Sequence, residues 1–138
     1  MEVPFVGNSP QYMSEEAAGA DLRAEFGHEI EPGQQVLIRT DTRVALQEGT
    51  CGLLMPRSSL CNKKGLLLVN SVGLLDSDYR GELMFCYRNV SDHVVQVQAG
   101  ERIGQLAIFP VLRATFTKVD DLSGTERGTG GFGSTGSN

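Results

Sequence analysis

Short apolar runs separated by turn residues constrain the fold of this chain more than any other feature. Runs such as Val36–Ile38, Leu66–Val69 and Leu83–Tyr87 alternate with segments rich in glycine, proline and acidic residues. Short strands at a spacing of roughly 8–12 residues are typical of β-sandwiches, barrels and jelly rolls. We therefore predict an all-β fold. The other predicted strands are Val44–Leu46, Leu53–Met55, Val94–Val97, Ile103–Val111 and Thr115–Val119.

One segment is predicted to be helical. Ser58 is a candidate N-cap for a helix of one or two turns through Leu60 and Lys63. Gly65 is the candidate left-handed residue that ends it. We thus expect one short helix within the β-fold.

The chain has 138 residues, which is the size of one domain at roughly 100–200 residues per domain. We predict a β-barrel domain over residues 1–123 and a flexible C-terminal arm over residues 124–138. The arm contains six of the 17 glycines, and so glycine-rich a segment builds no core of its own. Arg127 and Phe132 stand out in it as candidate ligand contacts.

The charge balance excludes two classes of partner. The net charge is −5 and the isoelectric point is near 5.0, whereas proteins that bind duplex DNA or anionic membranes are usually basic. No apolar run approaches the roughly 20 residues of a membrane span. The start Met1–Phe5 lacks the pattern of a signal peptide. We expect a cytoplasmic protein, or a nuclear one in a eukaryotic host, that binds neither nucleic acid nor membrane.

The three cysteines, Cys51, Cys61 and Cys86, have no spacing typical of a metal site. An odd number cannot be paired completely within the chain. We predict reduced thiols, with Cys86 in the core and the other two near the surface.

Polar clusters mark candidate sites of chemistry. In Pro56–Ser59, Arg57 offers a planar group for phosphate oxygens at a predicted helix start, although an ordinary capped turn has the same pattern. Gly73–Glu82 places two aspartates and a tyrosine in a predicted hairpin, which a solvated turn would also explain. Gly100–Gln105 is a charged turn that leads into a strand.

These clusters, together with Ala17–Ala24 before them and the glycine-rich arm after them, resemble the five motifs of the trimeric dUTPase family. Five motifs in this order and at this spacing are far more specific than any one of them. Leu75 is a small departure, at a position where isoleucine is common in the family. The matching segments are Ala18–Leu22, Pro56–Leu60, Asn70–Gly81, Gly100–Gln105 and Arg127–Gly136.

The resemblance implies a distorted jelly-roll β-barrel that assembles as a homotrimer with shared active sites. It implies hydrolysis of dUTP to dUMP and diphosphate, a reaction that keeps uracil out of DNA and supplies the precursor of thymidylate. By the same resemblance Asp76 is the general base, and Asp21 holds Mg²⁺ through a water.

The resemblance also implies the substrate contacts. Phosphate contacts match Arg57, Ser58 and Gln105, with Arg127 at the γ-phosphate. Asn70 matches the contact to uracil, Tyr79 packs against deoxyribose, and Phe132 stacks on the base. Ser59, Gly73, Gly133 and Ser134 complete the matching substrate-binding positions.

Two alternatives remain open from the sequence. A dCTP deaminase-like enzyme would share the fold but needs a glutamate base, for which no motif is visible. A dUTPase-like regulatory or signalling protein would be expected to lack Asp76, Arg57 or the arm, all of which are present.

Overall fold

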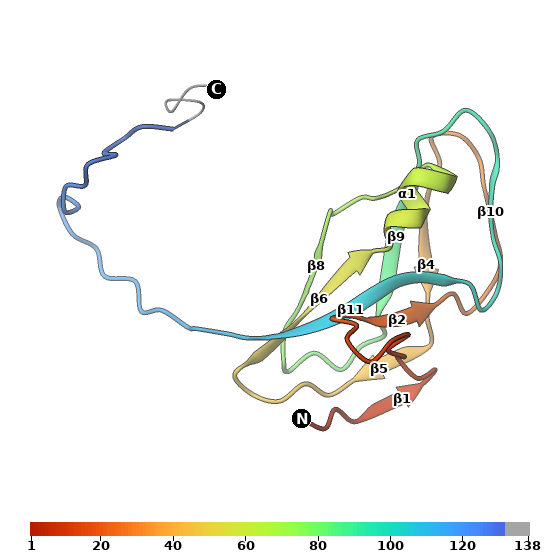
Figure 1. Cartoon of the computed structure of the whole chain (residues 1–138), viewed down its shortest axis with the longest axis horizontal. Helices are drawn as coiled ribbons and strands as arrows, with labels where there is room; N and C mark the ends of the chain where they lie inside the picture. The colour runs from red at the N-terminus through yellow and green to blue at the C-terminus, as the bar shows by residue number, and fades with distance from the viewer. Residues whose placement is uncertain (132–138) are drawn as a thin grey trace.

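The computed structural model describes residues 1–131. Within that range the chain forms eleven β-strands and one short helix (Figure 1). The all-β prediction is therefore confirmed. The elements in chain order are β1 (Phe5–Gly7), β2 (Ala20–Arg23), β3 (His28–Ile30), β4 (Gln35–Arg39), β5 (Thr42–Val44), β6 (Thr50–Pro56), α1 (Ser58–Lys64), β7 (Leu66–Leu68), β8 (Gly73–Leu75), β9 (Met84–Asn89), β10 (Val95–Val97) and β11 (Arg102–Pro110).

The strands pair only in antiparallel fashion in the part of the chain that the structure describes. One sheet has the strand order β2-β11-β6-β8, and a second has the order β4-β9-β7. Two ribbons, β1-β5 and β10-β3, complete the barrel. The longest ladder joins β11 to β6, from Gly104 opposite Pro56 to Pro110 opposite Thr50. This ladder brings the predicted polar clusters Pro56–Ser59 and Gly100–Gln105 to the same end of the sheet.

The core forms where the two larger sheets face each other. Along β9 the alternation of a half-buried strand places Phe85 and Tyr87 inward. The Tyr87 hydroxyl donates a hydrogen bond of 2.6 Å to the carbonyl of Ile103, and burial raises the pKa of Tyr87. A Cβ atom on Gly104 would overlap the Phe85 ring. Glycine is therefore required in β11 at this close approach of the two sheets.

The helix α1 follows β6 almost as predicted. Arg57, rather than Ser58, occupies the N-cap position, with extended backbone angles (φ −84°, ψ 138°) and no side-chain capping bond. Ser58 is the first helical residue, so the predicted start was one residue late. Gly65 ends the helix in the left-handed conformation (φ 66°, ψ 30°), as predicted. The helix is anchored by Leu60, which is buried in the core.

Two predicted elements were wrong. Thr115–Val119 forms no strand, because no strand among the described residues lies beside it, and Phe116 is 95% exposed. Figure 1 shows the chain after β11 running away from the barrel. Gly73–Glu82 is not a hairpin: β8 pairs with β6, whereas β9 lies between β4 and β7. This segment therefore crosses from one sheet to the other.

The three cysteines are free thiols, as predicted. Cys61 is exposed on α1 and Cys51 is half-buried. The core position predicted for Cys86 was wrong, because Cys86 lies on the outer face of β9, between the inward Phe85 and Tyr87, and is half-buried. None of the described helices has the length and apolar character needed to cross a membrane.

Candidate active site

Asp21 is a nearly buried carboxylate held by two arginines. Its Oδ2 atom accepts a hydrogen bond of 3.0 Å from Nη1 of Arg102 and lies 3.6 Å from Nε of Arg57. The side chain of Asp21 is 10% exposed, and a carboxylate so far out of water requires such charged partners. Both arginines contact the Oδ2 atom of Asp21. Within the described residues, Oδ1 is thus available to a further donor or to water.

The β2–β11 ladder places Gln105 directly opposite Asp21. A Cβ atom on Gly19 would lie 2.6 Å from Oε1 of Gln105, so the glycine leaves room for this amide. Ser58, at the start of α1, is exposed, and Ser59 is half-buried. The structure thus gathers four of the predicted substrate-binding residues, Arg57, Ser58, Ser59 and Gln105, at one end of the four-stranded sheet, but not Arg127.

A cavity of about 300 Å³ lies beside the loop of residues 76–82. Its polar lining includes Asn70, Asp76 and Tyr79, three residues predicted to bind the nucleoside or activate water. Leu54 and Leu74 are part of its apolar wall. A small, mostly apolar cavity with a few polar groups is typical of a small-molecule site. The structure therefore brings these three predicted residues together.

Tyr79 is fixed over this loop by two contacts. Its hydroxyl donates a hydrogen bond of 3.2 Å to the carbonyl of Glu82. Its ring packs so closely on Gly81 that a Cβ atom there would overlap it. Gly73, also predicted to bind substrate, lies opposite Leu54 in the β6–β8 ladder.

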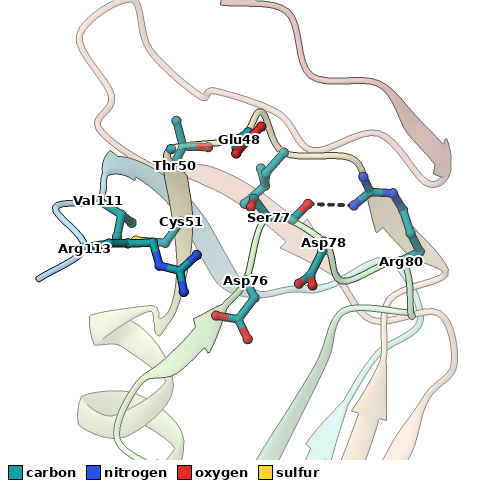
Figure 2. Close-up of a pocket in the computed structure, with 11 residues that line it drawn as sticks. Glu48, Thr50, Cys51, Asp76, Ser77, Asp78, Arg80, Val111 and Arg113 are labelled. Atoms are coloured by element: carbon teal, nitrogen blue, oxygen red, sulfur yellow. Dashed lines mark hydrogen bonds between the residues drawn. The ribbon is translucent and has the colours of Figure 1, made fainter. Parts of the chain in front are cut away.

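A second cavity, of about 800 Å³, adjoins the first and shares Asp76 with it. Figure 2 shows the side chain of Asp76 extending from the loop after β8, and that of Arg113 extending from the chain after β11. The Arg80 side chain is bonded to its own loop, because its Nη1 atom donates hydrogen bonds to the carbonyls of Ser77 (2.7 Å) and Tyr79 (2.9 Å). Sequence reasoning missed Arg113, since it lies outside every motif.

Within one chain, the residues around Asp76 and the predicted phosphate-binding residues around Arg57 are far apart. Leu75 pairs with Gly52, so the next residue, Asp76, lies near the start of β6. Arg57 follows the other end of β6. At about 3.3 Å per residue, the strand separates these two positions by roughly 20 Å. A single chain therefore does not bring Asp76 and Arg57 together.

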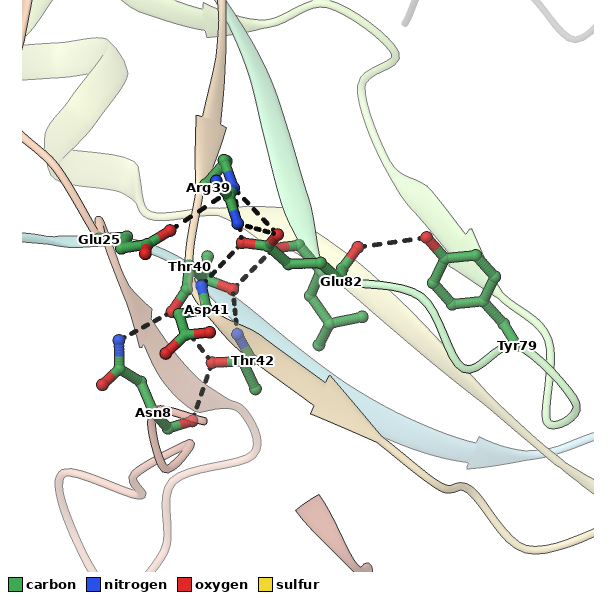
Figure 3. Close-up of polar contacts among 9 residues, drawn as sticks. Asn8, Glu25, Arg39, Thr40, Asp41, Thr42, Tyr79 and Glu82 are labelled. Atoms are coloured by element: carbon green, nitrogen blue, oxygen red, sulfur yellow. Dashed lines mark hydrogen bonds and ion pairs between the residues drawn. The ribbon is translucent and has the colours of Figure 1, made fainter. Parts of the chain in front are cut away.

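Glu82, the last residue of the segment predicted to be a hairpin, is at the centre of a polar network (Figure 3). Its Oε1 accepts 2.8 Å from the backbone N–H of Asp41, and its Oε2 lies 3.0 Å from Nη2 of Arg39. Partial burial acts to raise the pKa of Glu82, but the Asp41 N–H and the Arg39 guanidinium outweigh it and lower this pKa. The hydrogen bond to Glu82 in turn raises the pKa of Arg39. Glu82 is thus held as a carboxylate.

The arm contributes to neither cavity within the described part of the chain. Nε of Arg127 donates 2.8 Å to the carbonyl of Gly130, and the side chain is exposed. Phe132, Gly133 and Ser134, three predicted substrate-binding residues, lie outside the described residues.

Comparison with known proteins agrees with the motifs. The dUTPase family model matches residues 7–136. A deoxyuridine 5'-triphosphate nucleotidohydrolase of Hydrogenovibrio crunogenus is 48% identical over 93% of this chain and 86% of its own length. The enzyme of that name from Acinetobacter baylyi is 44% identical over 92% and 87%.

Solved structures give the same result. The dUTPase of Staphylococcus bacteriophage 80alpha with dUPNHPP matches 99% of both chains, with a TM-score of 0.90 and 27% identity. The dUTPase of Streptococcus mutans matches 81% of this chain and 98% of its own, with a TM-score of 0.76 and 33% identity. Sequence and fold agree over nearly the whole length, and we conclude that the chain belongs to the dUTPase family.

Proposed function

We propose that this chain hydrolyses dUTP to dUMP and diphosphate, with Asp76 as the base that activates water. The observation that carries the proposal is the position of Asp76 on the border of two cavities, one small and lined by Asn70 and Tyr79, the other larger and lined in part by charged residues. A carboxylate so placed can hold a water beside a bound nucleoside and accept its proton. Positioning that water in line with the α-phosphorus is the larger part of its task.

The smaller cavity is the proposed nucleoside site. An amide both donates and accepts hydrogen bonds, so Asn70 suits uracil but cannot by itself reject cytosine. Backbone groups near Gly73 provide the remaining discrimination, because their donors and acceptors are fixed by the β6–β8 ladder. The Tyr79 ring packs against deoxyribose and leaves no room for a 2′-hydroxyl.

The phosphate site is proposed to comprise Arg57, Ser58, Ser59 and Gln105, which one end of the four-stranded sheet holds close to Asp21. Guanidinium and hydroxyl groups stabilise the charge on phosphate oxygens during phosphoryl transfer. Because Asp76 is roughly 20 Å away along β6 in the same chain, a complete site requires another copy of the chain.

Mg²⁺ is the proposed metal, and the chemistry of Asp21 suits it. Magnesium commonly uses one or two carboxylates, substrate phosphates and several waters. The two arginines contact only Oδ2 of Asp21 among the described residues, which leaves Oδ1 to hold a metal-bound water. A bound Mg²⁺ would neutralise phosphate charge, while Asp21 orients the water and Asp76 moves the proton.

We further propose a homotrimer in which three chains share each site. One chain supplies Asp21, Arg57 and Gln105, a second supplies Asp76 with its nucleoside cavity, and a third supplies the arm. The barrel domain, residues 1–123, is the framework for the first two parts. In residues 124–138, Arg127 contacts the γ-phosphate, Phe132 stacks on uracil, and Gly133 and Ser134 complete the substrate contacts. Threefold symmetry then produces three equivalent sites.

A nucleotide panel tests the activity. Release of diphosphate is measured for dUTP, dCTP, dTTP and UTP, with and without Mg²⁺, and ammonia release from dCTP is measured in parallel. We expect diphosphate from dUTP above all and no ammonia. Ammonia from dCTP would identify a deaminase instead, and no turnover of any nucleotide would favour a regulatory protein.

A further inference from the structure

The loop of residues 76–82, which carries Asp76 and Tyr79, has no strand or helix of its own. Its ends are anchored by Leu75 and Leu83, both buried in the core. Tyr79 itself is 44% exposed. Apart from the packing of the ring on Gly81, the position of Tyr79 therefore depends on the contacts made near its hydroxyl.

The Tyr79 hydroxyl is hydrogen-bonded to the backbone carbonyl of Glu82, and the side chain of Glu82 contacts Arg39 and Asp41. The Tyr79 hydroxyl donates to the Glu82 carbonyl, while the Glu82 carboxylate accepts from the backbone of Asp41 and from Arg39 (Figure 3). The Glu82 side chain is only 10% exposed. It lines the nucleoside cavity together with Tyr79 and Asn70.

Both partners of Glu82 have further features of note. Arg39, on β4, also lies 3.5 Å from Glu25 and places its guanidinium carbon 6.0 Å from the centre of the Phe26 ring. Asp41 adopts a left-handed conformation (φ 51°), which is uncommon for a residue other than glycine. The Glu82 carboxylate satisfies the backbone N–H that this conformation presents.

We propose that Glu82, fixed by Arg39 and Asp41, is a positioning residue that sets the discrimination between dUTP and UTP by holding Tyr79 in place. This inference rests on the proposed function. A side chain excludes a 2′-hydroxyl by steric overlap only if it cannot move away from the sugar. Without the Glu82 carboxylate, the end of the loop loses its ion pair with Arg39 and its hydrogen bond to the Asp41 N–H, and Tyr79 withdraws far enough to admit a 2′-hydroxyl.

The first test compares kcat/KM for dUTP and UTP, measured by diphosphate release, in the full-length protein and in Glu82→Ala. We expect the UTP-to-dUTP ratio to rise about tenfold, with a smaller loss in kcat for dUTP. Glu82→Gln, which retains an oxygen for the Asp41 N–H, restores part of the discrimination. An unchanged ratio in a folded Glu82→Ala protein overturns the proposal.

A matched control is Glu101→Ala, the same substitution at another carboxylate. The Glu101 carboxylate also accepts a hydrogen bond of 2.9 Å from a backbone N–H, that of Gln98, and forms an ion pair of 2.6 Å with Nζ of Lys64. It does not line the nucleoside cavity. We expect its UTP-to-dUTP ratio to equal that of the unmodified protein. An equal rise in both variants would mean that any lost carboxylate loosens selectivity, which overturns the specific role of Glu82.

The second test asks whether Glu82 acts through Tyr79. In the Tyr79→Ala background the filter is absent, so adding Glu82→Ala should raise the ratio no further. An undiminished rise in that background overturns the proposal. If Glu82→Ala does not fold, Arg39→Gln takes its place in both tests with the same criteria.

The outcomes for the two proposals are distinct. If the unmodified protein does not hydrolyse dUTP, the proposed function fails and this inference fails with it. If the unmodified protein hydrolyses dUTP with high selectivity but Glu82→Ala keeps that selectivity, only the inference is overturned.

Discussion

Asp21 on β2 accepts a hydrogen bond of 3.0 Å from Arg102 on β11. The carboxylate proposed to hold the metal-bound water is thus oriented by a residue on the neighbouring strand, not by the substrate. Arg57, at the end of β6, approaches the same oxygen atom. Three strands therefore determine the direction in which the other carboxylate oxygen points.

Replacing Arg102 should be costly for stability. Arg102→Ala removes the closest partner of a carboxylate that is 10% exposed, and we expect the free energy of unfolding to fall by about 1–3 kcal/mol. Urea unfolding of the unmodified protein and of Arg102→Ala measures this difference in unfolding free energy. Arg88→Ala, at an exposed position on β9, is the matched control, with an expected change within about 0.5 kcal/mol. Equal stability of both variants would show that Arg102 contributes nothing through Asp21.

Asp76→Asn should separate catalysis from binding. The amide keeps the shape of the side chain but cannot accept the proton of the attacking water. We expect kcat to fall at least about tenfold, while the affinity for a non-hydrolysable dUTP analogue changes little. Steady-state diphosphate release and calorimetric titration measure the two quantities. A kcat above about a tenth of the original value would remove Asp76 from the role of base.

The Glu82–Arg39 pair should stabilise the fold in a pH-dependent manner. The pKa of Glu82 in the folded protein lies below its ordinary value of 4.5. Its ionised form therefore contributes stability that is complete above pH 4.5 and is lost as the pH falls through the lower folded value. The difference in unfolding free energy between the unmodified protein and Glu82→Gln should accordingly be largest near neutral pH. A difference that grew on acidification would contradict the assigned sign.

Local signals in the sequence predicted much of this fold. Gly65 ends α1 because only a left-handed residue fits there, and the apolar runs became strands. The predicted hairpin at Gly73–Glu82 failed because turn residues report a change of direction, not which strand will be the partner. Thr115–Val119 failed for the same reason, since its alternation requires a neighbouring strand and residues 1–131 provide none beside it.

The sequence grouped some residues of the candidate site but did not reveal the contacts between its distant parts. Asn70, Asp76 and Tyr79 come from one motif, so their common cavity follows from proximity in the chain. The link between Glu82 and Arg39 spans 43 positions and depends on the pairing of β4 with β9. No local pattern reveals such a pair.

The central claim is that Asp76 and the arm reach one dUTP-hydrolysing site from different chains. Asp76→Asn and a variant truncated before Arg127 should each be nearly inactive alone, and both should remain trimeric. They are unfolded, mixed in equal amounts and refolded. Three-quarters of randomly assembled trimers are then mixed, each with one complete site, so activity should recover to about a quarter of that of the unmodified protein. A mixture as inactive as its parents would show that Asp76 and the arm act from the same chain, contrary to this account.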